Sequence, residues 1–128
     1  FAAPLAVSWR ISSGYGWRQD PFTGVRSFHT GIDLVVPYGT SIKSAMSGTV
    51  AAAGYSNVYG NYVIINHGNG YQTLYAHMSS ASVKKGERVG RGGHIGYTGN
   101  TGYSTGTHLH FSVYRNGKLI NPAQVLKF

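Results

Sequence analysis

Short runs of apolar and β-branched residues, separated by glycine-rich segments, make up most of this chain. Residues 71–77 alternate between two faces, which predicts a half-buried strand, and the β-branched run at 62–66 predicts a buried one. The pattern also predicts strands at 31–36 and 107–114, two short strands within 41–53, a hairpin turn at 67–70, a type I′ turn at Asn116-Gly117 and a helical turn within 122–128. No segment has a sustained helical period, so we expect a mainly β protein, antiparallel and partly closed.

Two longer segments between these runs are predicted to be loops. Glycines, aromatic residues and a turn signal at 20–24 predict that residues 13–28 form a loop running toward His29. Residues 98–106 form the second loop, which leads directly into the strand predicted at 107–114. Loops of this kind often carry binding and catalytic residues.

The composition agrees with a single small β domain. A chain of 128 residues corresponds to about one domain, and its 41% hydrophobic residues suffice for one core. Its 19 glycines, 10 tyrosines and 11% charged residues favour strands and turns over helices. We expect no membrane span, since no apolar run approaches roughly 18 residues. The N-terminus has neither a signal-peptide pattern nor an initiator Met, so we expect a mature or excised domain. We also expect the protein to be a monomer or a domain of a larger protein.

The net charge of +8 favours anionic partners. A basic surface attracts polyanions such as nucleic acid, anionic lipid or an acidic cell envelope. A nucleic-acid binder is supported by charge alone, because the aromatic residues are not interleaved with Lys and Arg as stacking platforms require. We therefore expect no nucleic-acid partner.

The scarcity of reactive side chains excludes several kinds of chemistry. The chain has no cysteines, so disulfides, thiol nucleophiles and thiolate zinc sites are absent. Its only carboxylate residues are Asp20, Asp33 and Glu87. They do not supply the flanking pair of a glycosidase or a helical His-Glu-x-x-His motif. Acid–base chemistry in this protein therefore depends on histidine.

Two histidines lie one residue apart in the strand predicted at 107–114. Alternate residues of a strand share a face and lie roughly 6–7 Å apart, so His108 and His110 present two imidazoles side by side. Leu109 and Phe111 face the other way. One ring of such a pair can bind a metal while its neighbour transfers protons.

A second group with metal-ligand character is His-Thr-Gly-Ile-Asp at 29–33. If this segment is extended, His29 and Asp33 share a face, and Gly31 leaves no side chain between them to block a metal. With one ring of the His-Leu-His pair, they supply two histidines and one carboxylate, which suits Zn²⁺ with a fourth position open for water. His77, at the end of an apolar strand, either faces water or supplies another imidazole near the metal.

The order of short motifs along residues 12–122 resembles that of one family. The motifs are Gly-x-Arg-x-x-Pro, His-x-Gly-Ile-Asp, Pro-x-Gly-Thr, Gly-x-Val, Gly-Asn-x-Val-x-Ile-x-His-Gly, Tyr-Ala-His-Met-Ser, Val-x-x-Gly and Ser-Thr-Gly-x-His-Leu-His-Phe. This order is similar to that of the lysostaphin-type peptidoglycan endopeptidases. In that family, the positions of His29, Asp33 and His110 are zinc ligands, and those of His77 and His108 are catalytic histidines.

The resemblance also implies a fold, a reaction and a location. The implied fold is a compact single domain over residues 1–128, with antiparallel sheets and long loops forming a substrate groove. The implied reaction is hydrolysis of peptide bonds in the stem or cross-bridge of bacterial peptidoglycan, with one Zn²⁺ ion and no other cofactor, leading to cell-wall lysis. The domain would act outside the cell or in the cell envelope, after secretion or delivery by a phage or prophage. Anionic wall polymers would attract its basic surface.

The chain departs from the family pattern in two places. Thr107 stands where many relatives have Pro, which changes the loop locally. Some bacteriolytic relatives place a tyrosine in the loop before the first ligand, whereas residues 17–28 contain none. Other members have lost ligands and act as catalytically inactive peptidoglycan-binding or regulatory modules. That function is the alternative for this chain, although it retains all the matched ligand and catalytic positions.

The remaining polar candidates have weaker patterns. His67 lies in a hairpin turn and His94 among glycines, and both are interpreted as structural. In the loop before the His-Leu-His strand, Asn100 and Thr101 are expected to bind the peptide backbone of a substrate. Tyr103 is a candidate substrate-binding aromatic in the same loop, where a packing role suits it equally.

Overall fold

The computed structural model describes every residue except 20–22, 103 and 105. The described residues form twelve β-strands and one 3-10 helix, with no α-helix among them. The strands are β1 (Arg10–Ser13), β2 (Gly16–Gln19), β3 (Arg26–His29), β4 (Ile32–Val35), β5 (Ser41–Lys43), β6 (Gly48–Ser56), β7 (Gly60–Gly68), β8 (Tyr71–Ala81), β9 (Arg88–Val89), β10 (His94–Thr98), β11 (Leu109–Arg115) and β12 (Lys118–Ile120), and the 3-10 helix is η1 (Pro122–Gln124). The mainly β fold predicted from the pattern is confirmed.

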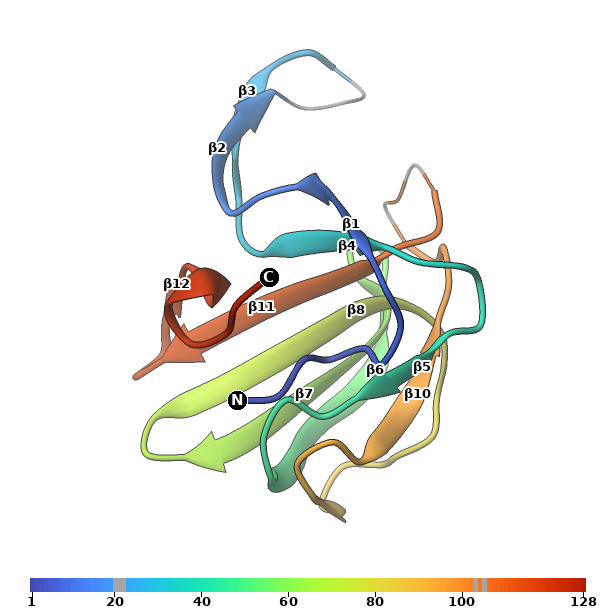
Figure 1. Cartoon of the computed structure of the whole chain (residues 1–128), viewed down its shortest axis with the longest axis vertical. Helices are drawn as coiled ribbons and strands as arrows, with labels where there is room; N and C mark the ends of the chain where they lie inside the picture. The colour runs from blue at the N-terminus through green and yellow to red at the C-terminus, as the bar shows by residue number, and fades with distance from the viewer. Residues whose placement is uncertain (20–22, 103, 105) are drawn as a thin grey trace.

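Ten of the strands form one sheet, and β2 and β3 form a separate two-stranded sheet. The main path of the large sheet is β1-β4-β11-β8-β7-β6-β9, with β12 beside β11 and β10 beside both β8 and β5 (Figure 1). All of these pairings are antiparallel. Strand β11 therefore lies between β4 and β8, which places its side chains close to those of both neighbours.

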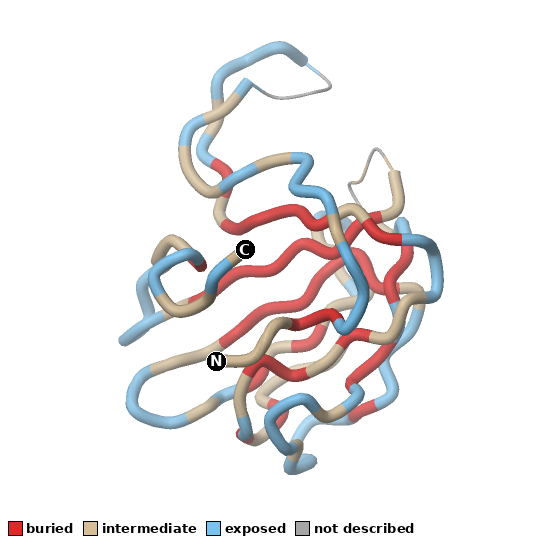
Figure 2. Tube along the Cα trace, viewed as in Figure 1, coloured by how far each residue is buried: buried red, intermediate tan, exposed pale blue. Residues whose placement is uncertain are grey.

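The core lies on one face of β11 and its neighbours. Leu109, Phe111 and Val113 are fully buried on this face, and the ring of Tyr75 in β8 lies 5.4 Å from that of Phe111. Figure 2 shows the same concentration of buried residues along β4, β11 and β8. Since side chains alternate along a strand, the opposite face of β11 carries the histidines.

The segment predicted to be a loop at 13–28 contains a β-hairpin instead. Strands β2 and β3 pair Gly16 with His29 and Trp17 with Phe28, and the rings of the second pair meet edge to face at 5.6 Å. Figure 1 shows this hairpin projecting from the main sheet. The turn signal predicted at 20–24 lies mostly outside the described residues, and the segments on both sides of it, which carry the aromatic residues Trp17 and Phe28, form strands.

The predicted turns and short elements agree with the structure. Asn116 and Gly117 have φ angles of 52° and 78°, as a type I′ turn requires at both positions. The helical turn predicted within 122–128 is η1. The structure also contains β10, which was not predicted because glycines interrupt the apolar pattern of this segment. None of the described helical residues forms a span of membrane-crossing length and hydrophobicity.

Candidate metal centre and active site

Three donor atoms, two from nearby residues and one from a distant part of the sequence, form a nearly equilateral triangle. His29 Nε2 lies 3.2 Å from Asp33 Oδ1, His110 Nδ1 lies 2.9 Å from the same oxygen, and the two nitrogens are 3.2 Å apart. The three residues are largely buried, with exposed fractions of 5%, 9% and 5%. This arrangement could hold one metal ion between two imidazoles and a carboxylate.

Each of these residues comes from a different strand. His29 ends β3, Asp33 lies in β4, and His110 lies in β11 directly opposite Asp33. The extended conformation expected for residues 29–33 is interrupted at 30–31, between β3 and β4. The hairpin therefore supplies His29, while the main sheet supplies Asp33 and His110.

Gly31 has a different role from the one predicted. A Cβ atom at this position would meet the carbonyl oxygen of Phe111, and it would lie 2.6 Å from Ser112 Oγ and 2.9 Å from His110 Nε2. The glycine thus allows the chain to cross close to β11. A side chain here would displace the supporting atoms of His110 rather than obstruct the metal position.

The second nitrogen of each candidate ligand histidine is held by the protein. His29 Nδ1–H donates to the Gly14 carbonyl at 2.8 Å, which leaves the Nε2 lone pair directed at Asp33. The Ser112 hydroxyl lies 2.9 Å from His110 Nε2 and can accept its proton, which leaves Nδ1 for a metal. Such contacts fix the tautomer and ring orientation of a metal ligand.

Two further histidines lie beside this triangle. His108 Nε2 is 3.6 Å from Asp33 Oδ1, beyond a hydrogen bond, while its Nδ1–H donates to the Gly106 carbonyl at 2.7 Å. His77 Nδ1–H donates to the Thr101 carbonyl at 2.7 Å, and its ring centroid is 4.9 Å from that of His108. The Nε2 atoms of both rings are therefore free to accept a proton.

A β-bulge directs His77 toward the site. Between the pairs Asn61–Met78 and Val63–Tyr75, β8 contains one residue more than β7. His77 itself has a φ of 60°, a left-handed conformation that costs a non-glycine residue about 1–3 kcal/mol. Strict alternation would put His77 on the same face of β8 as the buried Tyr75. The bulge therefore brings the His77 ring to the opposite face.

The local electrostatics favour a charged carboxylate beside neutral imidazoles. Burial alone would raise the pKa of Asp33, but its close contacts with the rings of His110 and His29 outweigh burial and hold that pKa well below its usual range. Burial lowers the pKa of His110 and lowers the pKa of His77 to about 4. At neutral pH these residues have the protonation states needed for metal binding and proton acceptance.

The candidate substrate-binding residues have different environments. Thr101 is engaged within the protein: its hydroxyl donates to the Met78 carbonyl at 2.6 Å and accepts from the Asn61 amide at 3.0 Å. Asn100 is exposed, and Tyr103 lies outside the described residues. The structure thus shows Thr101 positioning His77, while substrate contacts by these three residues stay a prediction.

The other two histidines have contacts of their own. His67 Nδ1 lies 3.0 Å from the Ser47 carbonyl, and its Nε2 lies 2.7 Å from the Thr73 hydroxyl. His94 lies between the hydroxyls of Ser41 and Ser82, at 2.6 and 3.0 Å. These contacts agree with the structural interpretation of both residues.

Tyr59 was not identified from the sequence. Its carbonyl accepts the His77 amide at 2.7 Å, and its ring centroid lies 6.0 Å from that of His110. No periodic pattern marks this residue, because it lies in the turn between β6 and β7. Ser112 was also missed, although its spacing from His108 and His110 places it on the same strand face.

Two imidazoles and a carboxylate that converge on one point, with two more histidines beside them, define the class of metal-dependent hydrolases. Residues 27–122 match Peptidase family M23, and the chain belongs to this family. The resemblance inferred from the motifs is thereby confirmed, as is the expectation of a metallopeptidase.

Individual relatives support this assignment. The chain is 42% identical over 119 residues to the peptidoglycan DD-endopeptidase ShyA of Vibrio cholerae, covering 92% of this chain and 28% of ShyA. A zinc-containing peptidase from Vibrio cholerae has a similar structure, with a TM-score of 0.87 and 36% identity over 93% of this chain and 37% of that one. The catalytic domain of the antimicrobial peptidase lysostaphin from Staphylococcus simulans gives a TM-score of 0.84 and 34% identity, covering 94% of this chain and 93% of that domain. The chain spans only about 28% of the first curated relatives it matches.

Proposed function

We propose that this domain is a zinc-dependent endopeptidase that hydrolyses peptide bonds in bacterial peptidoglycan. The observation that carries the proposal is the donor triangle of His29, Asp33 and His110, with His77 and His108 directly beside it. The relatives add the substrate class, since the similar protein ShyA is a peptidoglycan DD-endopeptidase.

The donor set fits zinc in type and in spacing. A tetrahedral site with ligand bonds of roughly 2.0–2.2 Å separates its donor atoms by roughly 3.3–3.6 Å. The edges of the triangle are 2.9, 3.2 and 3.2 Å, so side-chain shifts of a few tenths of an ångström would accommodate the ion. Zinc in such a site lowers the pKa of a bound water and polarises a carbonyl oxygen.

In this proposal, His77 and His108 move the protons of the reaction. Each ring donates its Nδ1–H to a backbone carbonyl, so each presents an unprotonated Nε2 to the site. A ring that takes a proton from the attacking water at Nε2 becomes an imidazolium. That imidazolium can offset the negative charge on the carbonyl oxygen and then deliver the proton to the departing amine.

The relatives' names also support a narrower substrate and location. A DD-endopeptidase cuts between two D-residues, which occur together in peptidoglycan cross-links, and we infer such a bond here. The antimicrobial relative lysostaphin supports a bacteriolytic activity. A substrate of this kind implies that the domain is secreted or otherwise reaches the cell envelope, where anionic polymers would attract its net charge of +8.

Replacing His108 with alanine separates the proposed enzyme from an inactive peptidoglycan-binding or regulatory module. Because His108 lies outside the donor triangle, His108→Ala is expected to keep one zinc per chain but to lose roughly 10²–10⁴-fold in peptidoglycan hydrolysis. Zinc is measured by atomic emission and hydrolysis by release of soluble fragments. His94→Ala is the matched control, because it removes a histidine whose hydrogen-bonding contacts are with Ser41 and Ser82 rather than with the donor triangle. An unchanged rate for His108→Ala would refute its proposed role.

A further inference from the structure

A hollow of about 490 Å³ adjoins the candidate active site. Ile64 of β7 and Leu74 of β8 form its floor on the sheet, and Ser56, Val58 and three tyrosines line the rest of it. The tyrosines are Tyr59, Tyr62 and Tyr114. No role in the proposed mechanism has been given to this hollow.

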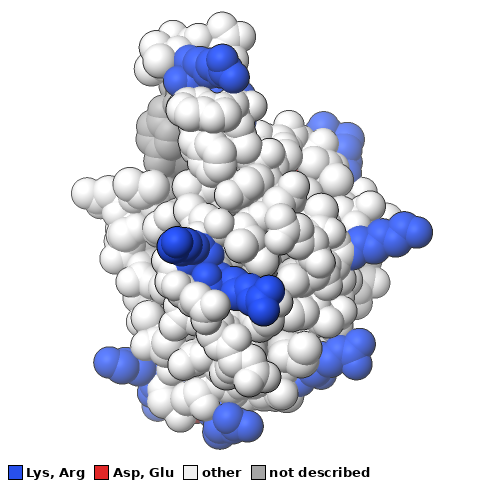
Figure 3. Space-filling model, turned by 90° about the vertical axis from the view of Figure 1, so that its left-hand side faces the viewer, with Lys and Arg blue, Asp and Glu red and all other residues white. Residues whose placement is uncertain are grey.

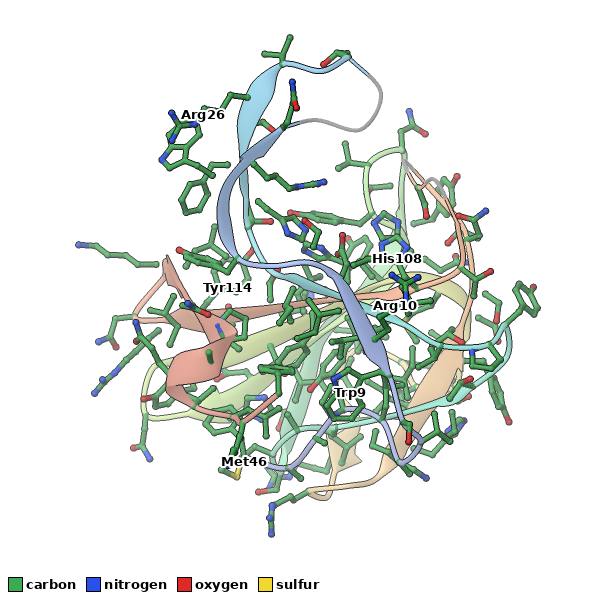
Figure 4. All side chains as sticks on the ribbon, turned by 45° about the horizontal axis from the view of Figure 1, so that its top comes forward. Trp9, Arg10, Arg26, Met46, His108 and Tyr114 are labelled. Atoms are coloured by element: carbon green, nitrogen blue, oxygen red, sulfur yellow. The ribbon has the colours of Figure 1, made fainter. Side chains whose placement is uncertain are left out.

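The hollow and the candidate active site lie on the same face of the main sheet. In β11, His110, Ser112 and Tyr114 are alternate residues and therefore share a face. Ser112 pairs with Leu74 of β8, and Leu74 pairs with Ile64 of β7, which extends this face sideways to the floor of the hollow. Figure 4 shows His108 and Tyr114 toward opposite ends of β11.

Tyr59 connects the two regions. Its ring centroid lies 6.0 Å from that of His110 on one side and 6.2 Å from that of Tyr62 on the other. The same residue lines the hollow and holds the His77 amide through its carbonyl. A peptide that extends from the donor triangle along β11 would therefore enter the hollow directly.

The lining suits an uncharged aliphatic group. None of the residues around the hollow is charged, although the chain has a net charge of +8. Burial and the neighbouring, hydrogen-bonded hydroxyl of Tyr59 raise the pKa of Tyr114, so its phenol stays neutral. A carboxylate or ammonium group would lose its hydration here without finding an opposite charge. Apolar carbons would gain contact with Ile64 and Leu74.

We propose that this hollow is a specificity pocket for an uncharged, aliphatic side chain on the residue at one side of the scissile bond. The proposal rests on the peptidase function proposed above. A volume of about 490 Å³ greatly exceeds the space of a methyl group, so the pocket favours a side chain with several carbons over alanine. The tyrosine hydroxyls at its walls provide polar contacts for the adjoining peptide groups.

The test combines matched substrates with a matched pair of variants. Acetylated peptides carry two adjacent D-residues at a central bond, with norleucine, alanine or glutamate on either side of it. The parent, Ile64→Val and Ile64→Thr are compared by kcat/KM on each peptide after loading with zinc. Val and Thr have nearly the same shape, so both variants shorten the side chain but only Thr places a hydroxyl on the floor.

The expected pattern is specific to the pocket. The parent prefers norleucine to alanine by about 10-fold or more at one of the two positions and disfavours glutamate there. Ile64→Val keeps most of this ratio, whereas Ile64→Thr lowers it several-fold. Equal ratios in the two variants, or no preference for norleucine at either position, would overturn the pocket while leaving the peptidase function intact.

A binding measurement separates failure of the pocket from failure of the proposed function. If the zinc-loaded protein cuts neither these peptides nor peptidoglycan, the peptidase proposal is rejected. The NMR signal of the ¹³C-labelled Ile64 methyl groups then decides the pocket alone. A saturable shift with the norleucine peptide and none with the glutamate peptide supports it, and no shift with either peptide overturns it.

Discussion

At the scale of residues, one hydrogen-bonding arrangement repeats in three of the four histidines of the site, and the fourth is held at its other ring nitrogen. His29, His77 and His108 each use Nδ1–H to bind a backbone carbonyl, and His110 is held through Nε2 by a serine hydroxyl. The remaining nitrogen of each ring is then available to the site around Asp33. Protein contacts thus fix four ring orientations before any metal or substrate binds.

The Ser112 hydroxyl is expected to contribute to metal affinity through His110. In Ser112→Ala, the buried Nε2–H of His110 loses its acceptor, so zinc affinity should fall roughly 10–100-fold. Competition with a calibrated chelator measures this affinity. Ser104→Ala is the matched control, because Ser104 Oγ lies 3.3 Å from His108 Nδ1 and touches no candidate ligand. Equal affinities in the two variants would show that the Ser112 contact does not support the metal.

Residue spacing predicted the cluster but not its supports. The alternation of His108 and His110 and the short distance from His29 to Asp33 in the sequence identified all four, because local geometry limits where such side chains can point. The choice between His108 and His110 as a ligand came from the family resemblance. Gly14 acts through a backbone carbonyl, which every residue has, so its contact with His29 leaves no sequence signal.

At the scale of elements, turns and irregularities complete the site. The bulge in β8 redirects His77, and the bend between β3 and β4 brings His29 over the sheet. The start of β7 packs against the loop that contains Thr101, since a Cβ on Gly60 would collide with that residue. This close contact fixes the carbonyl that holds His77.

Gly60→Ala is therefore expected to affect both stability and activity. Gly60 has a φ of 63°, and an added Cβ would also push Thr101 and its carbonyl away. Gly117→Ala is the control, because Gly117 has a φ of 78° but no atom within 4 Å of the added Cβ. Left-handed strain alone costs roughly 1–2 kcal/mol. Gly60→Ala should lower the free energy of unfolding, measured in urea, by more than this amount. It should also lower peptidase activity at least about tenfold. Equal effects of the two substitutions would contradict the positioning role of this contact.

The strands of the main sheet could be predicted, whereas the hairpin and the bulge could not. The runs at 62–66 and 71–77 are long enough for their period to identify β7 and β8. Strands β2 and β3 have four residues each, too few for a clear alternation. The bulge at His77 depends on the pairing of β7 with β8, and a single strand's sequence does not contain that pairing.

At the scale of the whole molecule, positively charged residues greatly outnumber negatively charged ones. The chain has 11 Lys and Arg residues and 3 Asp and Glu residues. The face in Figure 3 displays basic side chains and, among the residues described, no acidic ones. One of the few carboxylates, Asp33, lies in the candidate metal centre, so it does little to balance the surface charge.

Wall binding should therefore weaken with salt. Screening shortens the range of surface charges from about 10 Å at 0.1 M salt to about 3 Å at 1 M. Sedimentation with peptidoglycan that carries anionic polymers should show most of the protein bound at low salt and little at high salt. Hydrolysis of a soluble, uncharged peptide should change much less over the same range. Retention that is independent of salt would contradict an electrostatic contribution to wall binding.

The composition predicted the fold class and the charge at this scale, and the motif order predicted the family. The pocket beside Tyr59 could not be predicted, because its lining comes from β6, β7, β8, β11 and the turn between β6 and β7. Only the sheet pairings place these residues together.

The most direct test of the whole account is mass spectrometry of fragments released from purified peptidoglycan by metal-free and zinc-restored protein. Protein stripped with a chelator should release no new fragments, and one equivalent of zinc should restore cleavage. Every cleavage should then fall at the same peptide bond, with one new carboxyl terminus and one new amino terminus at the cut and with the glycan chains intact. Equal cleavage in excess chelator, or intact peptide cross-links after incubation with fully zinc-loaded protein, would contradict the proposed zinc endopeptidase.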